Sequence, residues 1–144
     1  MKIKVAIIED QRETLNSLTT LLNNSDVLEV IGSFSSGEEA LSSIPRIAPD
    51  VAMIDIGLPG IYGIEVIKEI NEKMPAIEML VLTVYEDKKH LFAALKAGNS
   101  GYLLKDSNPE EIINTVKDIR NNNASMSPTI ARYVIEYFHE YKSM

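Results

Sequence analysis

Apolar and polar residues follow one another in blocks that predict strands and helices in turn. Between the predicted strands, apolar residues recur every three or four positions, which is the period of an amphipathic helix. Alternating strands and helices predict a parallel sheet with right-handed crossovers, and near-continuous apolar strands indicate a sheet covered on both faces. We therefore expect an α/β fold, a doubly wound five-stranded parallel sheet. The predicted strands are residues 4–8, 27–34, 51–54, 77–84 and 101–104.

Local signals predict where several helices begin and end. Asp10 is placed to cap the first helix, and Ser36–Glu39 matches the S-x-x-E capping box. Gly98 is expected to close a helix, and Asn108-Pro109 places a cap followed by a proline at the first helical position. A last helix is expected from Ser127-Pro128.

These patterns divide the chain into a domain of residues 1–121 and a linker with a C-terminal helix, residues 122–144. The last helix carries a stripe of four apolar residues. The simplest interpretation is that this stripe packs on the domain, but a dimer interface is also compatible with it. The stripe consists of Ile130, Val134, Phe138 and Tyr141.

Composition limits the classes of protein to which this chain can belong. A chain of 144 residues with 45% hydrophobic content is long enough for one domain with a substantial core. The absence of cysteine excludes disulfides and thiolate metal sites and fits a reducing cytosol. No signal peptide or run of ~20 apolar residues is present, so we expect a cytoplasmic protein without a membrane segment. A net charge of −7 makes this domain a poor nucleic-acid surface.

Charged or polar residues end four of the predicted strands: Glu9-Asp10, Asp55, Thr83 and Lys105. Because the carboxyl ends of parallel strands share one edge of the sheet, these residues are expected to meet there. Three carboxylates held together repel one another unless a cation lies among them, and all-oxygen ligands favour Mg²⁺.

The remaining groups suit phosphoryl transfer. Lys105 supplies a positive charge and Thr83 a hydroxyl donor, which can neutralise and orient phosphoryl oxygens. A carboxylate can itself be the nucleophile and form an aspartyl phosphate. Asp55 is the best candidate, since its strand is expected to be central and the flexible Gly57 follows. Taken singly, Thr83 and Lys105 have ordinary structural interpretations, and it is their combination that indicates chemistry.

This combination resembles the receiver domains of bacterial two-component response regulators. The matching features are the acidic pair Glu9-Asp10, the run Asp55-Ile-Gly-Leu-Pro-Gly60, Thr83, and Lys105 preceded by Gly-Tyr-Leu-Leu. The resemblance covers residues 2 to about 121. It implies a flavodoxin-like (βα)5 fold and a phosphorylation-dependent switch rather than an enzyme, with a sensor histidine kinase as the phosphoryl donor.

The resemblance also implies a role for each matching residue. Asp55 would be the phosphoacceptor, and Thr83 and Lys105 would contact the phosphoryl group. Tyr102 would be the aromatic switch residue. The implied Mg²⁺ ligands are Glu9, Asp10, Asp55 and the backbone carbonyl of Gly57.

Two segments are similar to the NarL/FixJ (LuxR-type) subfamily: Gly101-Tyr-Leu-Leu-Lys-Asp106, and Met126–Arg132, which resembles the linker to a helix-turn-helix domain. The resemblance implies control of transcription, a homodimer on phosphorylation, and DNA contact only through an output domain that is not in this chain. A receiver that stands alone and acts by protein–protein contact is the alternative, although the linker-like tail favours an excised domain.

Two other functions fit the residues less well. A Mg²⁺ phosphohydrolase with an aspartyl nucleophile needs a second Asp just after the first and a cap insertion, but Ile56 and Gly57 follow Asp55. A flavin carrier needs a phosphate-binding loop rich in Ser, Thr and Gly after the first strand, and no such loop is seen there.

Val84 and Tyr85 are bulky for positions beside Thr83, and we hypothesise that they slow both the entry of the phosphoryl group and the attack of water. His90 and His139 are expected far from the acids and are assigned no role.

Overall fold

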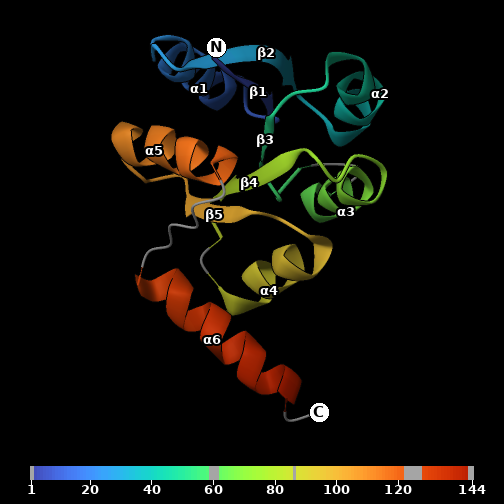
Figure 1. Ribbon diagram of the computed structural model, residues 1–144, viewed down its shortest axis with the longest axis vertical. Coiled ribbons are helices and arrows are strands. Elements are labelled where there is room, and N and C mark those ends of the chain that lie inside the picture. The colour runs from blue at the N-terminus through green and yellow to red at the C-terminus, as the bar shows by residue number, and fades with distance from the viewer. Residues whose placement is uncertain (1, 59–61, 86, 122–127, 143–144) are drawn as a thin grey trace.

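The computed structural model describes residues 2–58, 62–85, 87–121 and 128–142. Its strands form one all-parallel sheet in the order β2-β1-β3-β4-β5 (Figure 1), so the predicted doubly wound fold is confirmed. The strands are β1 (Ile3–Ile8), β2 (Leu28–Phe34), β3 (Val51–Ile54), β4 (Glu78–Thr83) and β5 (Gly101–Leu104). The helices are α1 (Arg12–Asn23), α2 (Gly37–Ile47), α3 (Gly63–Lys73), α4 (Lys88–Ala97), α5 (Pro109–Arg120) and α6 (Pro128–Lys142).

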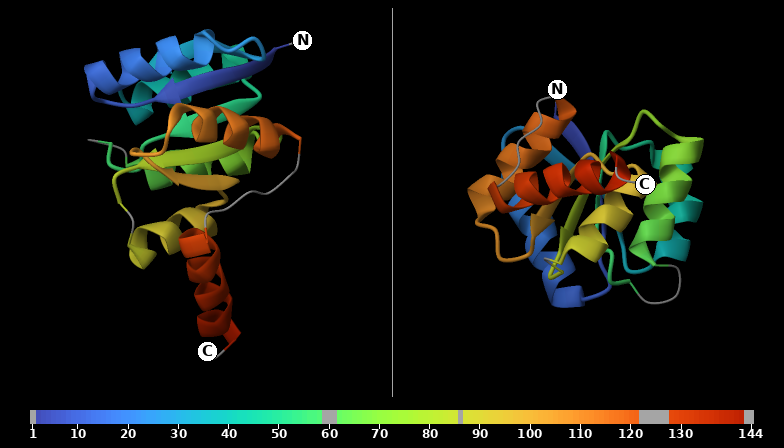
Figure 2. Two further views of the ribbon diagram at one scale, coloured as in Figure 1. Left: turned by 90° about the vertical axis from the view of Figure 1, so that its left-hand side faces the viewer. Right: turned by 90° about the horizontal axis from the view of Figure 1, so that it is seen from below.

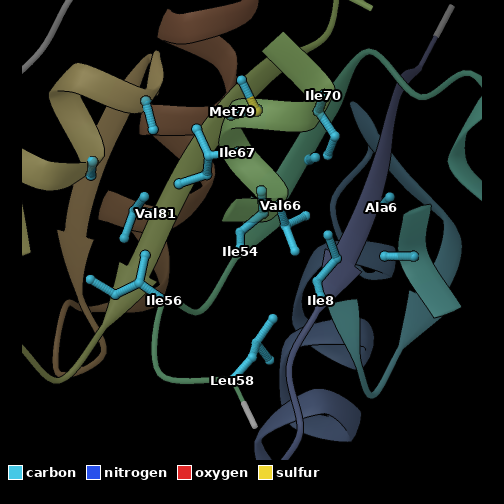
Figure 3. Close-up of a cluster of buried hydrophobic side chains, with 14 of the residues drawn as sticks. Ala6, Ile8, Ile54, Ile56, Leu58, Val66, Ile67, Ile70, Met79 and Val81 are labelled. Atoms are coloured by element: carbon cyan, nitrogen blue, oxygen red, sulfur yellow. The ribbon is translucent and has the colours of Figure 1, made fainter. Parts of the chain in front are cut away.

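Two hydrophobic clusters hold the helices to the two faces of the sheet. Helices α1 and α5 cover one face and α2, α3 and α4 the other, as Figures 1 and 2 show. Within β1, Val5 and Ile7 belong to the cluster under α1 and α5, while Ala6 and Ile8 belong to the other. Figure 3 shows the second cluster, in which strand and helix side chains meet. Burying each large apolar side chain contributes about 1.5–3 kcal/mol, which explains the apolar strands.

The edge where the strand order reverses carries the predicted site. β1 lies between β2 and β3, with Ile8 paired to Ile54 at their carboxyl ends. Just beyond, the backbone N–H of Asp55 donates to the carbonyl of Ile8 (3.0 Å), and that of Glu9 donates to Phe34 (2.9 Å). The two acids therefore leave neighbouring strands at the switch point, where open α/β sheets bind ligands.

Most of the predicted helix ends are confirmed. The Ser36 side chain accepts a hydrogen bond from the Glu39 N–H, Asn108 caps α5, and Gly98 closes α4 in the left-handed conformation (φ 107°). The prediction that Asp10 caps α1 is wrong, because the N-cap is Gln11 and no side chain caps it. The helix begins late enough for the Asp10 carboxylate to lie near those of other acids, described below.

Helix α6 extends past the sheet and lies against α4 (Figure 2). Lys88 and Glu136 form an ion pair between the two helices, and the rings of Phe92 and Tyr137 are 5.0 Å apart. The predicted packing of the apolar stripe is confirmed for Val134, which joins the core cluster, but is wrong for Phe138, which is 63% exposed. The side chains of the other two stripe residues, Ile130 and Tyr141, lie outside the described set.

No helix in the described part of the chain is both long enough and apolar enough to cross a bilayer.

Candidate functional site

Four strand ends bring the predicted side chains to one edge of the sheet. Glu9 directly follows β1, Asp55 follows β3, Thr83 ends β4 and Lys105 follows β5. Asp55 and Glu9 are 8% and 2% exposed, and Thr83 is completely buried. Buried carboxylates need charged or hydrogen-bonding partners, so the contacts among these residues decide what the edge can do.

Lys105 joins the two buried acids. Its Nζ lies 2.8 Å from Oδ2 of Asp55 and 2.5 Å from Oε1 of Glu9. The backbone N–H of Lys105 donates to the carbonyl of Thr83 (2.8 Å), so the end of the β4–β5 ladder fixes where the side chain begins. Burial lowers the pKa of Lys105, but the hydrogen bond to Asp55 and the close negative charges of Asp55 and Glu9 outweigh it, and the net pKa is raised. Lys105 therefore remains a cation.

Glu9, Asp10 and Asp55 each offer a carboxylate oxygen within 4.8 Å of the others. Burial is the main reason that the pKa of Glu9 is raised, and the charge of Asp55 adds to it. Oε2 of Glu9 accepts from the N–H of Gln11 (3.1 Å), whereas the buried Oε1 has no hydrogen-bond partner, its contact with Lys105 being an ion pair without hydrogen-bond geometry. A buried, incompletely satisfied oxygen within an all-oxygen cluster fits a hard divalent cation such as Mg²⁺.

The backbone after β3 fixes the Asp55 carboxylate. Oδ1 of Asp55 accepts from the N–H of Gly57 (2.9 Å), while Oδ2 faces Lys105. Gly63 begins α3 directly against this backbone: a Cβ there would lie 2.4 Å from the Asp55 carbonyl oxygen and from Cα of Ile56. The close approach therefore requires glycine at position 63. Residues 59 and 60 of the predicted motif lie outside the described set, and the proposed ligand role of the Gly57 carbonyl stays a prediction.

Thr83 and Tyr102 both hold the backbone of Tyr85. The N–H of Tyr85 donates to Oγ1 of Thr83 (3.4 Å), and the hydroxyl of Tyr102 donates to the carbonyl of Tyr85 (2.6 Å). Tyr102 is 7% exposed, and burial raises the pKa of its phenol. The two predicted switch residues are thus connected through one residue of the loop after β4.

The two bulky residues after Thr83 have different surroundings. Val84 is 68% exposed and, with Leu104, Lys105 and Asp106, lines a hollow of about 270 Å³. The ring of Tyr85 lies beside Gly57. The effect of both side chains on access to Asp55 stays a prediction.

His90, which was expected far from the acids and was assigned no role, packs on the loop after β4. Its ring stacks on that of Tyr85, with centroids 4.1 Å apart. The sequence holds a signal for this residue in Asp87, the N-cap of α4 three positions earlier, which is the spacing at which side chains of a helix meet.

Comparison with known proteins identifies the family of this chain. The family model of the response regulator receiver domain matches residues 5–117. The transcriptional regulatory protein DesR of Bacillus subtilis is 34% identical over 128 residues, which are 89% of this chain and 63% of DesR. The DNA-binding transcriptional activator DevR/DosR of Mycobacterium tuberculosis is 35% identical, over 81% of this chain and 54% of that protein.

Solved structures of similar proteins agree with the fold. A LuxR-family two-component response regulator from Aurantimonas sp. has a TM-score of 0.87 at 26% identity and covers 94% of this chain and 97% of that one. The receiver domain of the response regulator NarL from Mycobacterium tuberculosis has a TM-score of 0.81 at 28% identity and covers 85% of this chain and 98% of its own. The chain spans 63% of DesR and 54% of DevR/DosR, so it corresponds to part of these curated relatives. The chain belongs to the response regulator receiver domain family.

Proposed function

We propose that this chain is a phosphoacceptor switch in which Asp55 receives a phosphoryl group from a phosphohistidine of a sensor histidine kinase. The observation that carries the proposal is the contact between Asp55 Oδ2 and Lys105 Nζ (2.8 Å) beside two further carboxylates. A nucleophilic carboxylate beside a fixed cation, at the switch point of the sheet, suits phosphoryl transfer. The proposed receiver comprises residues 1–121.

The chemistry assigns a step to each group. An oxygen of Asp55 attacks phosphorus, the bond from phosphorus to the donor nitrogen breaks, and its electron pair stays on the donor imidazole. Lys105 is placed to neutralise charge on the phosphoryl oxygens, because its ammonium already contacts the nucleophile. Thr83 is the hydroxyl donor. The product is an aspartyl phosphate, and its hydrolysis returns the free carboxylate and inorganic phosphate.

The carboxylate cluster is proposed to hold Mg²⁺ through Glu9, Asp10 and Asp55, together with the backbone carbonyl of Gly57. When bound, the cation would supply positive charge that offsets the repulsion between acids and phosphoryl oxygens. The residues fit this role, since the side-chain ligands are all oxygens and the buried Oε1 of Glu9 has an ion pair with Lys105 but no hydrogen bond.

The signal is proposed to leave the site through Thr83 and Tyr102. Both hydrogen-bond the backbone of Tyr85, so a phosphoryl group that recruits the Thr83 hydroxyl would release one of these bonds and alter the loop. This loop leads into α4, so a shift in its equilibrium would change the face that α4 and β5 present. The change would promote pairing of two copies of the chain.

The whole protein is proposed to control transcription in the cytoplasm. DesR and DevR/DosR are named as transcriptional regulators, and this chain matches part of their length. DNA contact would come from an output domain joined through residues 122–144, since the receiver itself is acidic, with a net charge of −7 for the chain. The role is regulatory, and the chain assists its own phosphorylation and dephosphorylation.

The test is intact mass after incubation with Mg²⁺ and acetyl phosphate. Wild type should gain one phosphoryl group, about 80 Da, and lose it again on standing, while Asp55→Asn should gain none. Asp50→Asn is the matched control, because Asp50 precedes the same strand at the opposite edge of the sheet and should leave the gain intact. Chelation of Mg²⁺ should abolish the gain.

Two results would contradict the proposal. One is a folded wild type, verified by circular dichroism, that gains no phosphoryl group from acetyl phosphate or from a histidine kinase. The other is an adduct that survives in Asp55→Asn, which would place the acceptor elsewhere.

A further inference from the structure

The side chain of Tyr85 has a contact of its own, in addition to the hydrogen bonds of its backbone. Its ring stacks on the ring of His90, with centroids 4.1 Å apart and planes inclined by 3°. Tyr85 is 39% exposed, so packing on the core does not by itself fix the ring. Parallel aromatic stacking at this distance restricts the ring to one orientation.

Asp87 anchors His90. Nδ1 of His90 lies 2.7 Å from the Asp87 carboxylate, which also accepts from the His90 backbone N–H (3.2 Å) as the N-cap of α4. The hydrogen bond from His90 is the main reason that the pKa of Asp87 is lowered. The imidazole is therefore attached to the first turn of a helix that packs on the sheet, and the N-cap residue of that helix holds the ring.

The stacked ring of Tyr85 lies next to the acceptor site. A Cβ placed on Gly57 would be 3.2 Å from Cε2 of Tyr85 and 3.5 Å from Oδ1 of Asp55. The ring and the carboxylate oxygen thus both lie next to the position that a side chain at residue 57 would occupy. Because residue 57 is glycine, no side chain separates the Tyr85 ring from Oδ1 of Asp55 there.

We propose that His90 is a positioning residue that holds the Tyr85 ring beside Asp55, and that the ring slows hydrolysis of the aspartyl phosphate. This inference rests on the proposed function, since it concerns the lifetime of the phosphoryl group on Asp55. In hydrolysis a water oxygen attacks phosphorus, the bond from phosphorus to the Asp55 oxygen breaks, and its electron pair returns to the carboxylate. The ring lies beside Oδ1 of the carboxylate that carries the phosphoryl group, so it takes up part of the space through which water can reach phosphorus. Asp87, His90 and Tyr85 together set how long the signal lasts.

The experiment compares loss of the phosphoryl group after acetyl phosphate is removed, in Mg²⁺, by intact mass over time. The variants are Tyr85→Ala, His90→Ala and His90→Phe, with Lys89→Ala as control, because Lys89 is an exposed neighbour on the same helical turn. Tyr85→Ala and His90→Ala should each lose phosphate about three- to tenfold faster, the range expected when an aromatic contact is removed. Lys89→Ala should match wild type.

Two further variants distinguish a positioning role of His90 from a general effect on the structure. His90→Phe keeps an aromatic ring for stacking but loses the bond to Asp87, so its rate should lie between those of wild type and His90→Ala. The double variant Tyr85→Ala/His90→Ala should be no faster than Tyr85→Ala alone, because His90 acts through the ring. Circular dichroism establishes that each variant is folded.

The outcomes distinguish this inference from the proposed function. If wild type gains a phosphoryl group on Asp55 but His90→Ala loses it no faster, the inference is wrong and the proposed function stands. Equal rates for His90→Phe and His90→Ala, or additive effects in the double variant, would also overturn it. If wild type gains no phosphoryl group at all, both fail.

Discussion

The hydroxyl of Tyr102 donates a hydrogen bond to the backbone carbonyl of Tyr85, at 2.6 Å, and so connects β5 to the loop after β4. The phenol is buried, so the bond is shielded from water. The same loop residue donates its N–H to Thr83. The conformation of the loop is therefore determined by one side chain on each of two neighbouring strands.

Tyr102→Phe should loosen this loop without disturbing the packing of the ring. The substitution removes one hydrogen bond, and the free energy of unfolding should fall by about 1 kcal/mol. Urea denaturation measures the change. Tyr62→Phe is the control, because Tyr62 is 62% exposed and its substitution should change stability by less than about 0.5 kcal/mol. Equal effects in the two variants would show that the bond contributes nothing.

Lys105→Met should destabilise the metal-free protein. The substitution removes the cation that lies between Glu9 and Asp55 and leaves two buried carboxylates to repel each other. We expect a loss of about 2 kcal/mol in the presence of a chelator, since one partner of a buried ion pair has gone. Added Mg²⁺ should restore part of it.

The control for Lys105→Met is Lys73→Met, which breaks a pair with Glu69 at a side chain that is 70% exposed. Exposed pairs contribute little, so the change should stay below about 0.5 kcal/mol. A Lys105→Met variant as stable as Lys73→Met would contradict the electrostatic role of Lys105.

Glu9→Gln should change how stability depends on pH in metal-free protein. Burial raises the pKa of Glu9 above its ordinary value of 4.5, so the folded state binds the proton more tightly than the unfolded chain. The stabilising contribution of this proton is complete below the ordinary value and is lost as the pH rises through the raised pKa. Glutamine stays neutral and should remove that loss, so the stability of the variant should fall less than that of wild type as the pH rises toward 7.

Denaturation between pH 4 and pH 8 with a chelator present measures this effect. Glu29→Gln serves as the control, because Glu29 is exposed on β2 and should leave the pH dependence as in wild type. Parallel stability curves for Glu9→Gln and wild type would refute the explanation.

Gly63→Ala should be costly although the change is one methyl group. The added Cβ would lie 2.4 Å from the Asp55 carbonyl oxygen, so either α3 or the backbone that carries the acceptor has to move. We expect a loss of about 3 kcal/mol in thermal or urea unfolding, together with weaker phosphorylation of Asp55. At Gly57 the nearest atom is Cε2 of Tyr85 at 3.2 Å, a tight contact rather than a clash, so Gly57→Ala should cost less than about 1 kcal/mol. Similar losses for both variants would show that the close contact at Gly63 is not the cause.

Much of the fold and the composition of the site follow from the sequence alone. The apolar runs predict each strand to within a few residues, because a strand covered on both faces must be apolar throughout. The polar residue after each run predicts a shared edge, since parallel strands all end on the same side. Asp55, Lys105 and Thr83 could therefore be chosen before any coordinates were available.

Contacts between elements could not be predicted in this way, because they depend on which elements become neighbours in the folded chain. The order of the strands brings Glu9 next to Asp55 and Lys105 within reach of both, and no local pattern encodes that order. The start of α1 at Arg12 overturned the cap assigned to Asp10. The packing of α6 on α4 left Phe138 exposed.

The clearest case is His90. The spacing of Asp87 and His90 indicates one contact of the histidine, but no local pattern identifies Tyr85 as the ring that stacks on it, because that contact depends on the path of the loop after β4. The periods of helices and strands are local properties, so the sequence by itself determined the elements and the residues at their ends. Contacts between side chains from different elements depend on how the whole chain packs, and only the tertiary structure decided them.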